Sequence, residues 1–406
     1  MSLRRTAVPL VSLRLGVSGL RSRASQTGGT LLVVIAPQKP NGAPGPLNSG
    51  RSGQTGALGY GHRARCLEQR APYGRAHKNG GEFMQVKQAL RAVVTATFAA
   101  VAGAMSHGAV FAAAPMIKTQ APAYYRLMLG DIEVTAISDG TVGLPVDKLL
   151  FDVDPQALQS ALANAHLKPP VETSVNGFLI NTGSKLVLID AGAGPLFGPT
   201  LGKLVANLKL AGYQPEQVDE IYLTHMHPDH LGGLMEGDKL AFPNAVVRAD
   251  KREAAFWLSQ ENLDKAPDDS KDFFRGAMAS LNPYVKAGKF KPFEGDTDLG
   301  GGIKAVATYG HTAGHIVYTV ESKGQKLIVW GDLIHVGSVQ FPNPSVVIHF
   351  DSDSKEALAQ RLKIFAEVAK QGDIVAAAHL SFPGVGHIRP AGSGYTWLPI
   401  NYQSIP

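Results

Sequence analysis

Cysteine is almost missing from this chain of 406 residues, in which Cys66 is the only one. A framework of disulfides is therefore excluded, and so is a metal site built on thiolates. Any metal that the chain binds must use histidine, aspartate and water. Aromatic residues make up only 7% of the sequence, but the hydrophobic fraction of 44% is that of an ordinary globular protein with a full core.

Acidic residues are scarce at the start of the chain. Residues 1 to 114 hold 14 lysines and arginines but only 2 acids, which leaves 25 basic and 31 acidic side chains for the rest. The formal net charge of +6 therefore comes from the leader, and the body is slightly acidic. An acidic body argues against a nucleic-acid partner and against an RNA nuclease, because both need a basic surface.

Residues 1–83 have almost no acids and no sustained hydrophobic periodicity, and are rich in Arg, Gly, Ser, Pro and Ala. Such a composition cannot bury enough surface to offset the entropy of ordering the chain. We expect this segment to be a disordered basic extension or a mis-called upstream stretch. A basic arm that binds nucleic acid or membranes is the rival interpretation.

The segment that follows has the pattern of a secretory signal peptide over residues 84–112. Lys87 and Arg91 give a positive start after Met84, an apolar run covers residues 92–105, and small residues follow. Cleavage after Ala112 fits best, and the apolar run is too short for a comfortable membrane span. The sequence thus predicts a start at Met84 and a periplasmic or secreted protein, with no membrane span after cleavage.

From about residue 120 strands and helices alternate without a linker, which predicts a single domain over residues 120–406. Alternation and apolar runs predict strands at residues 131–137, 175–181, 185–189, 221–224, 246–249, 303–308, 316–320, 326–330 and 374–378. Helical spacing predicts helices at 201–211 and 355–370, and mainly helix over 250–290. A turn is expected at residues 138–140, where Ser-Asp-Gly follows the first strand.

Histidine is concentrated in the stretch Thr224–His230, directly after the apolar run 221–223. Its six last positions include four potential ligands, which are His225, His227, Asp229 and His230. Histidine and carboxylate are the donors that borderline divalent metals prefer.

Three later polar residues, His311, Asp332 and His379, also follow the carboxyl ends of predicted strands. Strand ends in a layered sheet converge on one edge, so these residues are expected to meet the cluster at 225–230. One metal takes three or four protein ligands, so the seven together predict a site for two. His315 is expected to be structural, because the seven other residues already supply enough ligands for two metals.

The H-x-H-x-D-H motif at 225–230, with Gly-His at 310–311, Gly-Asp at 331–332 and Ala-His at 378–379, resembles the metallo-β-lactamase superfamily. That resemblance implies an α/β fold of four layers, the αββα sandwich. The segments 213–220, 277–284 and 379–384 resemble more narrowly the group of methyl parathion hydrolases and dihydrocoumarin lactonases.

The resemblance also implies roles for individual residues. One divalent ion would be held by His225, His227 and His311, the other by Asp229, His230 and His379, with Asp332 bridging them. Zinc is the expected metal, and manganese, cobalt or iron suit the same donors. A hydroxide that bridges the two metals would attack the substrate, and Asp229 would also shuttle a proton to the leaving oxygen. Asp190 would orient a ligand imidazole by binding its ring nitrogen that faces away from the metal. The resemblance also implies a homodimer.

The pocket is also inferred from the resemblance, which places Phe197, Trp257 and Phe273 in the substrate pocket rather than in the ordinary core. Organophosphate-cleaving members tend to carry Arg, Leu, Thr and Leu at the positions of Leu149, His335, Ile348 and Phe350. They also have one more residue near 268–271. These four positions are expected to line the pocket and to select the substrate.

The sequence therefore predicts a metal-dependent hydrolase that opens lactones or cleaves aryl esters such as dihydrocoumarin. The alternatives are an organophosphate triesterase resembling methyl parathion hydrolase, an acyl-homoserine lactone quorum-quenching lactonase, and a metal-binding protein without activity. A β-lactamase would usually have Cys in place of Asp332. A flavodiiron oxidoreductase typically has an acid in place of His227.

Overall fold

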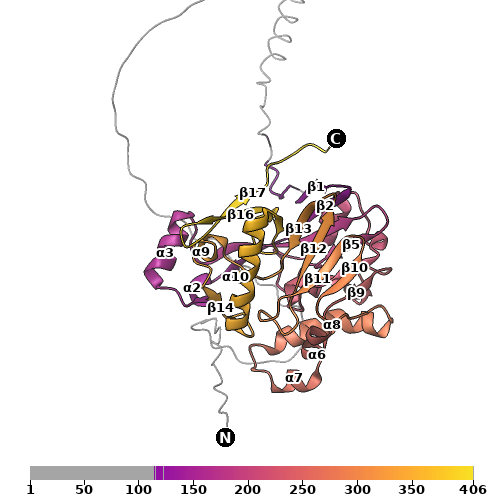
Figure 1. Cartoon of the computed structure of the whole chain (residues 1–406). Coiled ribbons are helices and arrows are strands. Elements are labelled where there is room, and N and C mark those ends of the chain that lie inside the picture. Colours follow the sequence, from indigo (N-terminus) through magenta and orange to yellow (C-terminus); the bar gives the residue numbers. More distant parts are fainter. Residues whose placement is uncertain (1–113, 115, 122, 406) are drawn as a thin grey trace, which may run out of the picture. The chain divides into compact units, whose positions relative to one another are not determined.

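The structure is a computed structural model that describes residues 114, 116–121 and 123–405 (Figure 1). The basic extension predicted at 1–83 and the signal peptide predicted at 84–112 lie outside the described residues. Within the described part of the chain, no helix combines the length and the apolar character that a membrane crossing requires.

Two mixed sheets form the centre of the fold. The first has the order β1-β2-β4-β5-β6-β9, with strands Tyr124–Leu129, Ile132–Leu144, Val171–Asn181, Leu186–Ile189, Glu220–Tyr222 and Val246–Arg248. The second has the order β10-β11-β12-β13-β15-β16-β17, with strands Thr297–Gly300, Ile303–Ala307, Ile316–Ser322, Gln325–Val329, Ile374–Ala376, Val385–Ala391 and Gly394–Pro399. Two further sheets have two strands each: β3 (Leu150–Phe151) pairs antiparallel with the distant β14 (Val347–Ile348), and β7 (Met235–Glu236) forms a short hairpin with β8 (Lys239–Leu240).

Side-chain alternation along the strands divides the apolar residues between an inner and an outer layer. In β5, Val187 and Ile189 point into the core between the two sheets, where they pack with residues of the second sheet such as Tyr318. Leu188 belongs instead to the outer face, where helices cover the first sheet. This period of two is what a sheet covered on both faces requires.

Helices cover the outer faces of both sheets, which completes the four-layer αββα sandwich. The helices on the first sheet pack through residues such as Leu208, Phe274 and Leu281. On the second sheet, α10 contributes Ile364 and Phe365 to a cluster with the outer strand residues, and Figure 1 shows it lying across these strands. The helices are α2 (Val146–Leu149), α3 (Pro155–Asn164), α4 (Leu204–Leu210), α5 (Pro228–Leu231), α6 (Lys251–Trp257), α7 (Gln260–Lys265), α8 (Lys271–Lys286), α9 (Gly337–Gln340) and α10 (Ser354–Gln371).

Parallel pairs at the centres of the sheets set the position of the site. In the first sheet β5 pairs parallel with β6, and in the second sheet β13 pairs parallel with β15. Their carboxyl ends therefore open onto one edge of each sheet, and the loops that follow carry polar residues. The fold class expected from the sequence is confirmed, and so is the placement of the polar cluster after strand ends.

The turn expected at residues 138–140 is wrong. Strand β2 continues through this segment to Leu144, with a bulge between Ser138 and Gly140. The carboxylate of Asp139 accepts hydrogen bonds from the amides of Ala193, Gly202 and Leu204, at 2.9 to 3.0 Å. The Asp139 carboxylate that suggested a turn thus binds the amides of a neighbouring loop. Gly140 adopts the positive φ of 127° at the bulge.

The helix expected from residue 201 begins only at Leu204. Gly202 has a positive φ of 78°, which is incompatible with helix continuation, and its amide is bound by Asp139. The helix therefore starts at Leu204, whose amide is also bound by the Asp139 carboxylate.

Backbone contacts between loops leave little space beside the cluster at 225–230. A Cβ on Gly233 would meet the carbonyl oxygen of Ala191, and a Cβ on Gly232 would meet that of Ala193. Only glycine allows the chain that follows His230 to lie this close to the loop that follows Asp190.

We expect Gly233→Ala to lower the free energy of unfolding by about 1–3 kcal/mol, because the loops must separate to admit the methyl group. Urea unfolding followed by circular dichroism measures the change. The control is Gly143→Ala on β2, where the residue is exposed and the nearest atom, on Pro170, lies at 3.3 Å. The control should shift stability by less than about 0.5 kcal/mol; equal losses in the two variants would contradict the crowding argument.

Candidate metal centre

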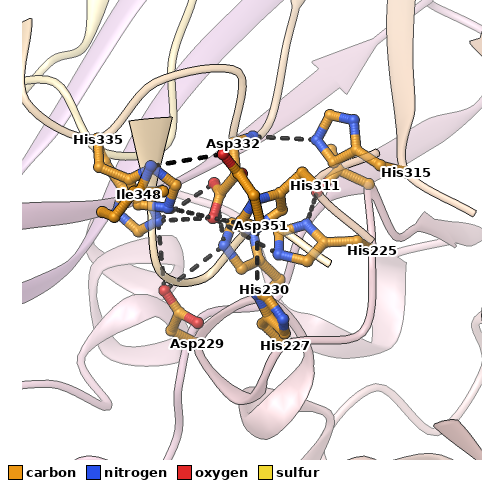
Figure 2. A network of polar contacts seen from close by, with 12 residues as sticks. His225, His227, Asp229, His230, His311, His315, Asp332, His335, Ile348 and Asp351 are labelled. Carbon is orange, nitrogen blue, oxygen red and sulfur yellow. Dashed lines mark hydrogen bonds and ion pairs between the residues drawn. The ribbon is translucent and has the colours of Figure 1, made fainter. Parts of the chain in front are cut away.

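The structure brings the seven ligand candidates of the sequence together in one buried cluster (Figure 2). They form two groups that could each hold an ion, with ligand atoms within 4.8 Å of one another in each group, and a third group overlaps them by joining His335 to Asp332 and His379. The first group is His225, His227, His311 and Asp332, and the second is Asp229, His230 and His379. Both groups have the number and the kind of donors that a divalent transition metal takes.

Asp332 lies between the two groups, with Oδ2 toward the first and Oδ1 toward the second, and Nε2 of His379 is also 3.2 Å from Oδ2. Its Oδ2 is 3.5 Å from Nε2 of His225 and 3.3 Å from Nε2 of His311. Its Oδ1 is 3.2 Å from Nε2 of His230 and 3.1 Å from Nε2 of His379. This is the position that a carboxylate bridging two ions would occupy.

Loop geometry explains how three imidazoles and a carboxylate from six consecutive residues can converge. The chain leaves β6, and His227 is the extended residue before α5, with φ −68° and ψ 147°. Pro228 occupies the first helical position, where its fixed φ favours helix initiation. The short helix then places Asp229 and His230 in the second group, while His225 and His227 precede it and belong to the first.

Four of the five imidazoles are fixed through their Nδ1 atom, so their Nε2 atoms face the cluster. The partners of Nδ1 are Thr224 Oγ1 for His225 (3.0 Å), Asp190 Oδ2 for His230 (2.9 Å), Asp351 Oδ1 for His311 (2.8 Å) and the Ser174 carbonyl for His379 (3.0 Å). The exception is His227, whose Nδ1 itself faces the cluster, 3.2 Å from Nε2 of His311. A hydrogen bond at the far nitrogen selects the tautomer that leaves a lone pair for a metal.

The donor atoms that face the gap fit two metal ions. Among the described residues, Nε2 of His225, Nε2 of His230 and Oδ1 of Asp332 are buried and have no hydrogen-bond partner. Buried polar atoms without partners are costly, and convergent ones are explained by a bound ion. The residues present therefore match a dinuclear site of histidines and aspartates.

Burial and charge set the protonation states that a metal needs. Burial lowers the pKa of His225 and of His227 well below the usual value, so both imidazoles are neutral. Burial would raise the pKa of Asp332, but His230, His379 and the neighbouring imidazoles hold it well below its usual range. Burial would lower the pKa of His230, His311 and His379 as well, but Asp332 and the other carboxylates nearby raise all three, that of His311 to about 9, so these rings must release a proton when a divalent cation binds.

Asp190 lies where the sequence placed it, behind a ligand imidazole. Besides His230, it accepts hydrogen bonds from the amide and the hydroxyl of Thr224, both at 2.8 Å. Thr224 in turn contacts Nδ1 of His225. One carboxylate thus orients a histidine of the second group directly and one of the first group through a threonine.

His315 is structural, as expected. Its Nε2 accepts the amide of Asp332 at 3.1 Å, and its Nδ1 lies 2.9 Å from Oγ1 of Thr308. Burial lowers the pKa of His315 to about 3, which keeps the ring neutral for both contacts. Figure 2 shows the ring at the margin of the cluster, where it supports the backbone of Asp332.

The predicted pocket residues fall into two sets. Trp257 and Phe273 contact the ring of His227 edge-on, with centroids at 5.3 and 5.4 Å, and Phe197 packs against Phe273 at 6.5 Å. Phe197 keeps 38% of its surface exposed. These three aromatic residues form a wall beside the first group, and Trp257, which is 5% exposed, also belongs to the core cluster on the outer face of the first sheet, with Phe273 packed against that cluster.

The other set lies on the opposite side, around β3 and β14. His335 reaches the site itself, with Nε2 3.1 Å from Oδ2 of Asp332, and Phe350 packs on its ring at 5.7 Å. Leu149 and Ile348 are buried in a small apolar cluster and have almost no exposed surface. They pack beneath the residues on this side of the site. Their place in the substrate pocket stays a prediction.

Three buried charged residues that contact the ligand loops were missed in the sequence. Asp351 binds His311, and Arg361 of α10 lies behind it. Glu253 of α6 accepts the amides of Met226 at 2.8 Å and Gly314 at 2.7 Å, so it ties the first ligand loop to the loop that carries His311. Their sequence contexts are those of ordinary helix residues and a helix-capping segment, so no local signal marks them.

The pattern of the metallo-beta-lactamase superfamily matches residues 170–379, which is over half of the chain. The chain belongs to this superfamily. Together with the two groups of ligands, membership makes it a binuclear metal-dependent hydrolase of the metallo-β-lactamase fold.

Solved and characterised relatives within the superfamily agree with this. The hydrolase AbOPH of the beta lactamase superfamily is 39% identical, with a TM-score of 0.67 over 70% of this chain and 100% of that one. AidC, a dizinc quorum-quenching lactonase, is 26% identical, with a TM-score of 0.64 over 70% of this chain and 99% of that one. An N-acyl homoserine lactonase from a Bacillus species is 28% identical over 177 residues, which are 44% of this chain and only 62% of that relative.

We expect the purified protein to contain two divalent ions per chain, and a strong chelator to remove them with loss of both hydrolysis and stability. Stability falls because the ions bind the folded state only. Elemental analysis, an esterase assay and thermal unfolding measure the three effects. Adding back zinc, manganese or cobalt should restore them, whereas full activity after complete removal of metal would contradict the assignment.

Proposed function

We propose that this hydrolase opens lactones and cleaves aryl esters, and that dihydrocoumarin-like compounds are its preferred substrate class. The aromatic wall of Phe197, Trp257 and Phe273 beside His227 carries the proposal. Flat aromatic substrates pack on such walls in stacked or edge-on arrangements. The similarity to named lactonases supports a carboxylic ester bond as the target.

The cofactor we propose is a pair of zinc ions, held by the two ligand groups and shared through Asp332. The dizinc relative AidC supports zinc, and the donor set also suits manganese, cobalt or iron. When bound, such ions supply Lewis-acid activation of water and of the substrate carbonyl. The protein supplies buried imidazole ligands and a carboxylate that orients one histidine of each group, Asp351 for His311 and Asp190 for His230.

Asp229 is the residue best placed to move a proton. Its Oδ2 is 3.3 Å from Nε2 of His379 and 3.5 Å from Nε2 of His230, and its side chain is 19% exposed. The carboxylate of Asp332, by comparison, is only 2% exposed. Asp229 is therefore the ligand carboxylate that an incoming substrate can reach, and it can deliver a proton to the departing oxygen.

Acyl-homoserine lactones are the second candidate, because both AidC and the Bacillus relative are named lactonases of that class.

Weak organophosphate turnover is proposed as a side activity only. His335 and Phe350 narrow the side of the site next to Asp332, and a planar lactone fits beside them better than a tetrahedral phosphotriester. Export to the periplasm and a homodimer stay predictions of the sequence.

A substrate panel tests the order of activities. We expect kcat/KM to be highest for dihydrocoumarin, lower for an acyl-homoserine lactone and lowest for methyl parathion, since the wall favours flat aromatic groups. The same metal-loaded preparation serves for all three substrates, and p-nitrophenyl acetate reports metal-dependent esterase activity. A strong preference for methyl parathion would overturn the proposal, and a protein that binds metal without any hydrolysis would be a binding protein.

Replacing Asp229 with asparagine separates its proton transfer from its ligand role. Loss of a general acid lowers kcat by about 10²–10⁴-fold when the leaving group needs a proton. The departing alkoxide of an acyl-homoserine lactone needs one more than the phenolate of dihydrocoumarin, whose conjugate acid resembles tyrosine with a pKa of about 10. Asp229→Asn should therefore impair the aliphatic lactone more strongly, at unchanged metal content. Equal losses that follow the metal content would show a ligand role alone.

A further inference from the structure

Asp351 lies directly behind His311 and is as buried as the ligands themselves. Its Oδ1 is 2.8 Å from Nδ1 of His311, and the two side chains are 0% and 2% exposed. On the other side of the ring, Nε2 of His311 faces Nδ1 of His227 at 3.2 Å and Oδ2 of Asp332 at 3.3 Å. The carboxylate therefore fixes both the tautomer and the direction of one ligand of the first group (Figure 2).

Arg361 holds the surroundings of Asp351 in place from helix α10. It is 1% exposed, and its Nη2 lies 3.9 Å from Oδ2 of Asp351. Its Nη1 donates to the carbonyls of Pro344 (3.0 Å) and Val346 (2.6 Å), which lie just before β14. The guanidinium thus makes two hydrogen bonds and one ion pair to the segment that ends at Asp351.

The same guanidinium also reaches the loop of the bridging carboxylate. Nε of Arg361 donates to the carbonyl of Leu333 at 2.6 Å, and Leu333 follows Asp332 directly. Arg361 therefore connects the segment of Asp351 to the loop that carries Asp332. A buried guanidinium is costly unless it is paired, so its contacts are expected to be geometrically demanding.

The second group is oriented by a different carboxylate. Asp190, after β5 of the first sheet, contacts His230, whereas Asp351 contacts His311 on the side of the second sheet. Neither carboxylate contacts the histidine of the other one. Each group thus has one carboxylate in direct contact with one of its histidines, and Asp190 also reaches His225 of the first group, but only through the hydroxyl of Thr224.

We propose that Asp351 and Arg361 are positioning residues that act on the first metal position through His311, while Asp190 acts on the second through His230. The inference rests on the dinuclear centre and is independent of which ester is the substrate. Carboxylates behind ligand histidines typically raise metal affinity about 10–100-fold. Each support is therefore expected to control the affinity for one of the two ions.

The test is cobalt titration of the metal-free full-length protein, followed by visible absorption and by elemental analysis. We expect Asp351→Asn to weaken one of the two ions about 10–100-fold and to leave the other unchanged. Asp190→Asn should weaken mainly the other ion, with a smaller effect on the first through Thr224 and His225, so that the singly loaded forms of the two variants have different cobalt spectra. Equal weakening of both ions in either variant, or identical spectra, would overturn the proposal.

A matched control separates positioning from general stability. Asp139 is also a buried carboxylate, but its three hydrogen bonds go to backbone amides of residues 193, 202 and 204. Asp139→Asn should lower the stability of the metal-free protein and keep both cobalt affinities. If it weakens cobalt binding as much as Asp351→Asn does, the effect of Asp351 is general destabilisation and the proposal fails.

Coupling between the two proposed residues gives a second measurement. Arg361→Lys keeps the charge but cannot serve three carbonyls and Asp351 at once, so it should weaken the same ion as Asp351→Asn. The double variant should lose less affinity than the sum of the single losses, because both act through His311. Additive losses would contradict the proposal that Arg361 and Asp351 act together through His311. If Arg361→Lys does not fold, the test rests on Asp351→Asn, which leaves the carbonyl contacts of Arg361 in place. A wild type that binds two ions but opens no lactone would refute the proposed substrate alone.

Discussion

Asp332 divides its two carboxylate oxygens between two sets of histidines, and the rest of the structure is arranged to hold it there. Four ligand imidazoles approach it within 3.1 to 3.5 Å, all of them buried. Such a density of donors with lone pairs aimed at one gap is unfavourable without bound cations. The fold must therefore impose this arrangement on the chain before the ions bind.

Two sheets share this task. The first sheet supplies the loop with His225 to His230 after β6, and the second supplies His311, Asp332 and His379 after β11, β13 and β15. The apolar core between the sheets fixes the distance between these loops, since residues such as Ile189, Tyr222 and Tyr318 belong to one cluster. A close-packed core transmits any change in sheet spacing to the ligand distances.

The outer helices contribute charge to the centre as well as apolar cover. Glu253 of α6 binds backbone amides in two ligand loops, and Arg361 of α10 binds carbonyls around two others. Each side chain passes inward from a helix that otherwise packs through apolar residues. The ligand loops are thus held by hydrogen bonds from both outer layers, which limits the directions in which the imidazoles can turn.

Local pattern and composition determined a large part of this protein. The seven candidate ligands and most strands follow from apolar runs that end in histidine or aspartate, because strand ends of one sheet edge converge. The four-layer fold is implied by the resemblance of the ligand motifs to the metallo-β-lactamase superfamily. Residues 138–140 and 201–203 were misjudged, since Asp139 binds amides more than fifty residues away and no local signal reveals this. Asp351, Arg361 and Glu253 likewise look like ordinary residues near helix starts or on helix faces. Only the tertiary structure decided which charges stand behind which ligand, because those contacts join segments that the sequence does not place side by side.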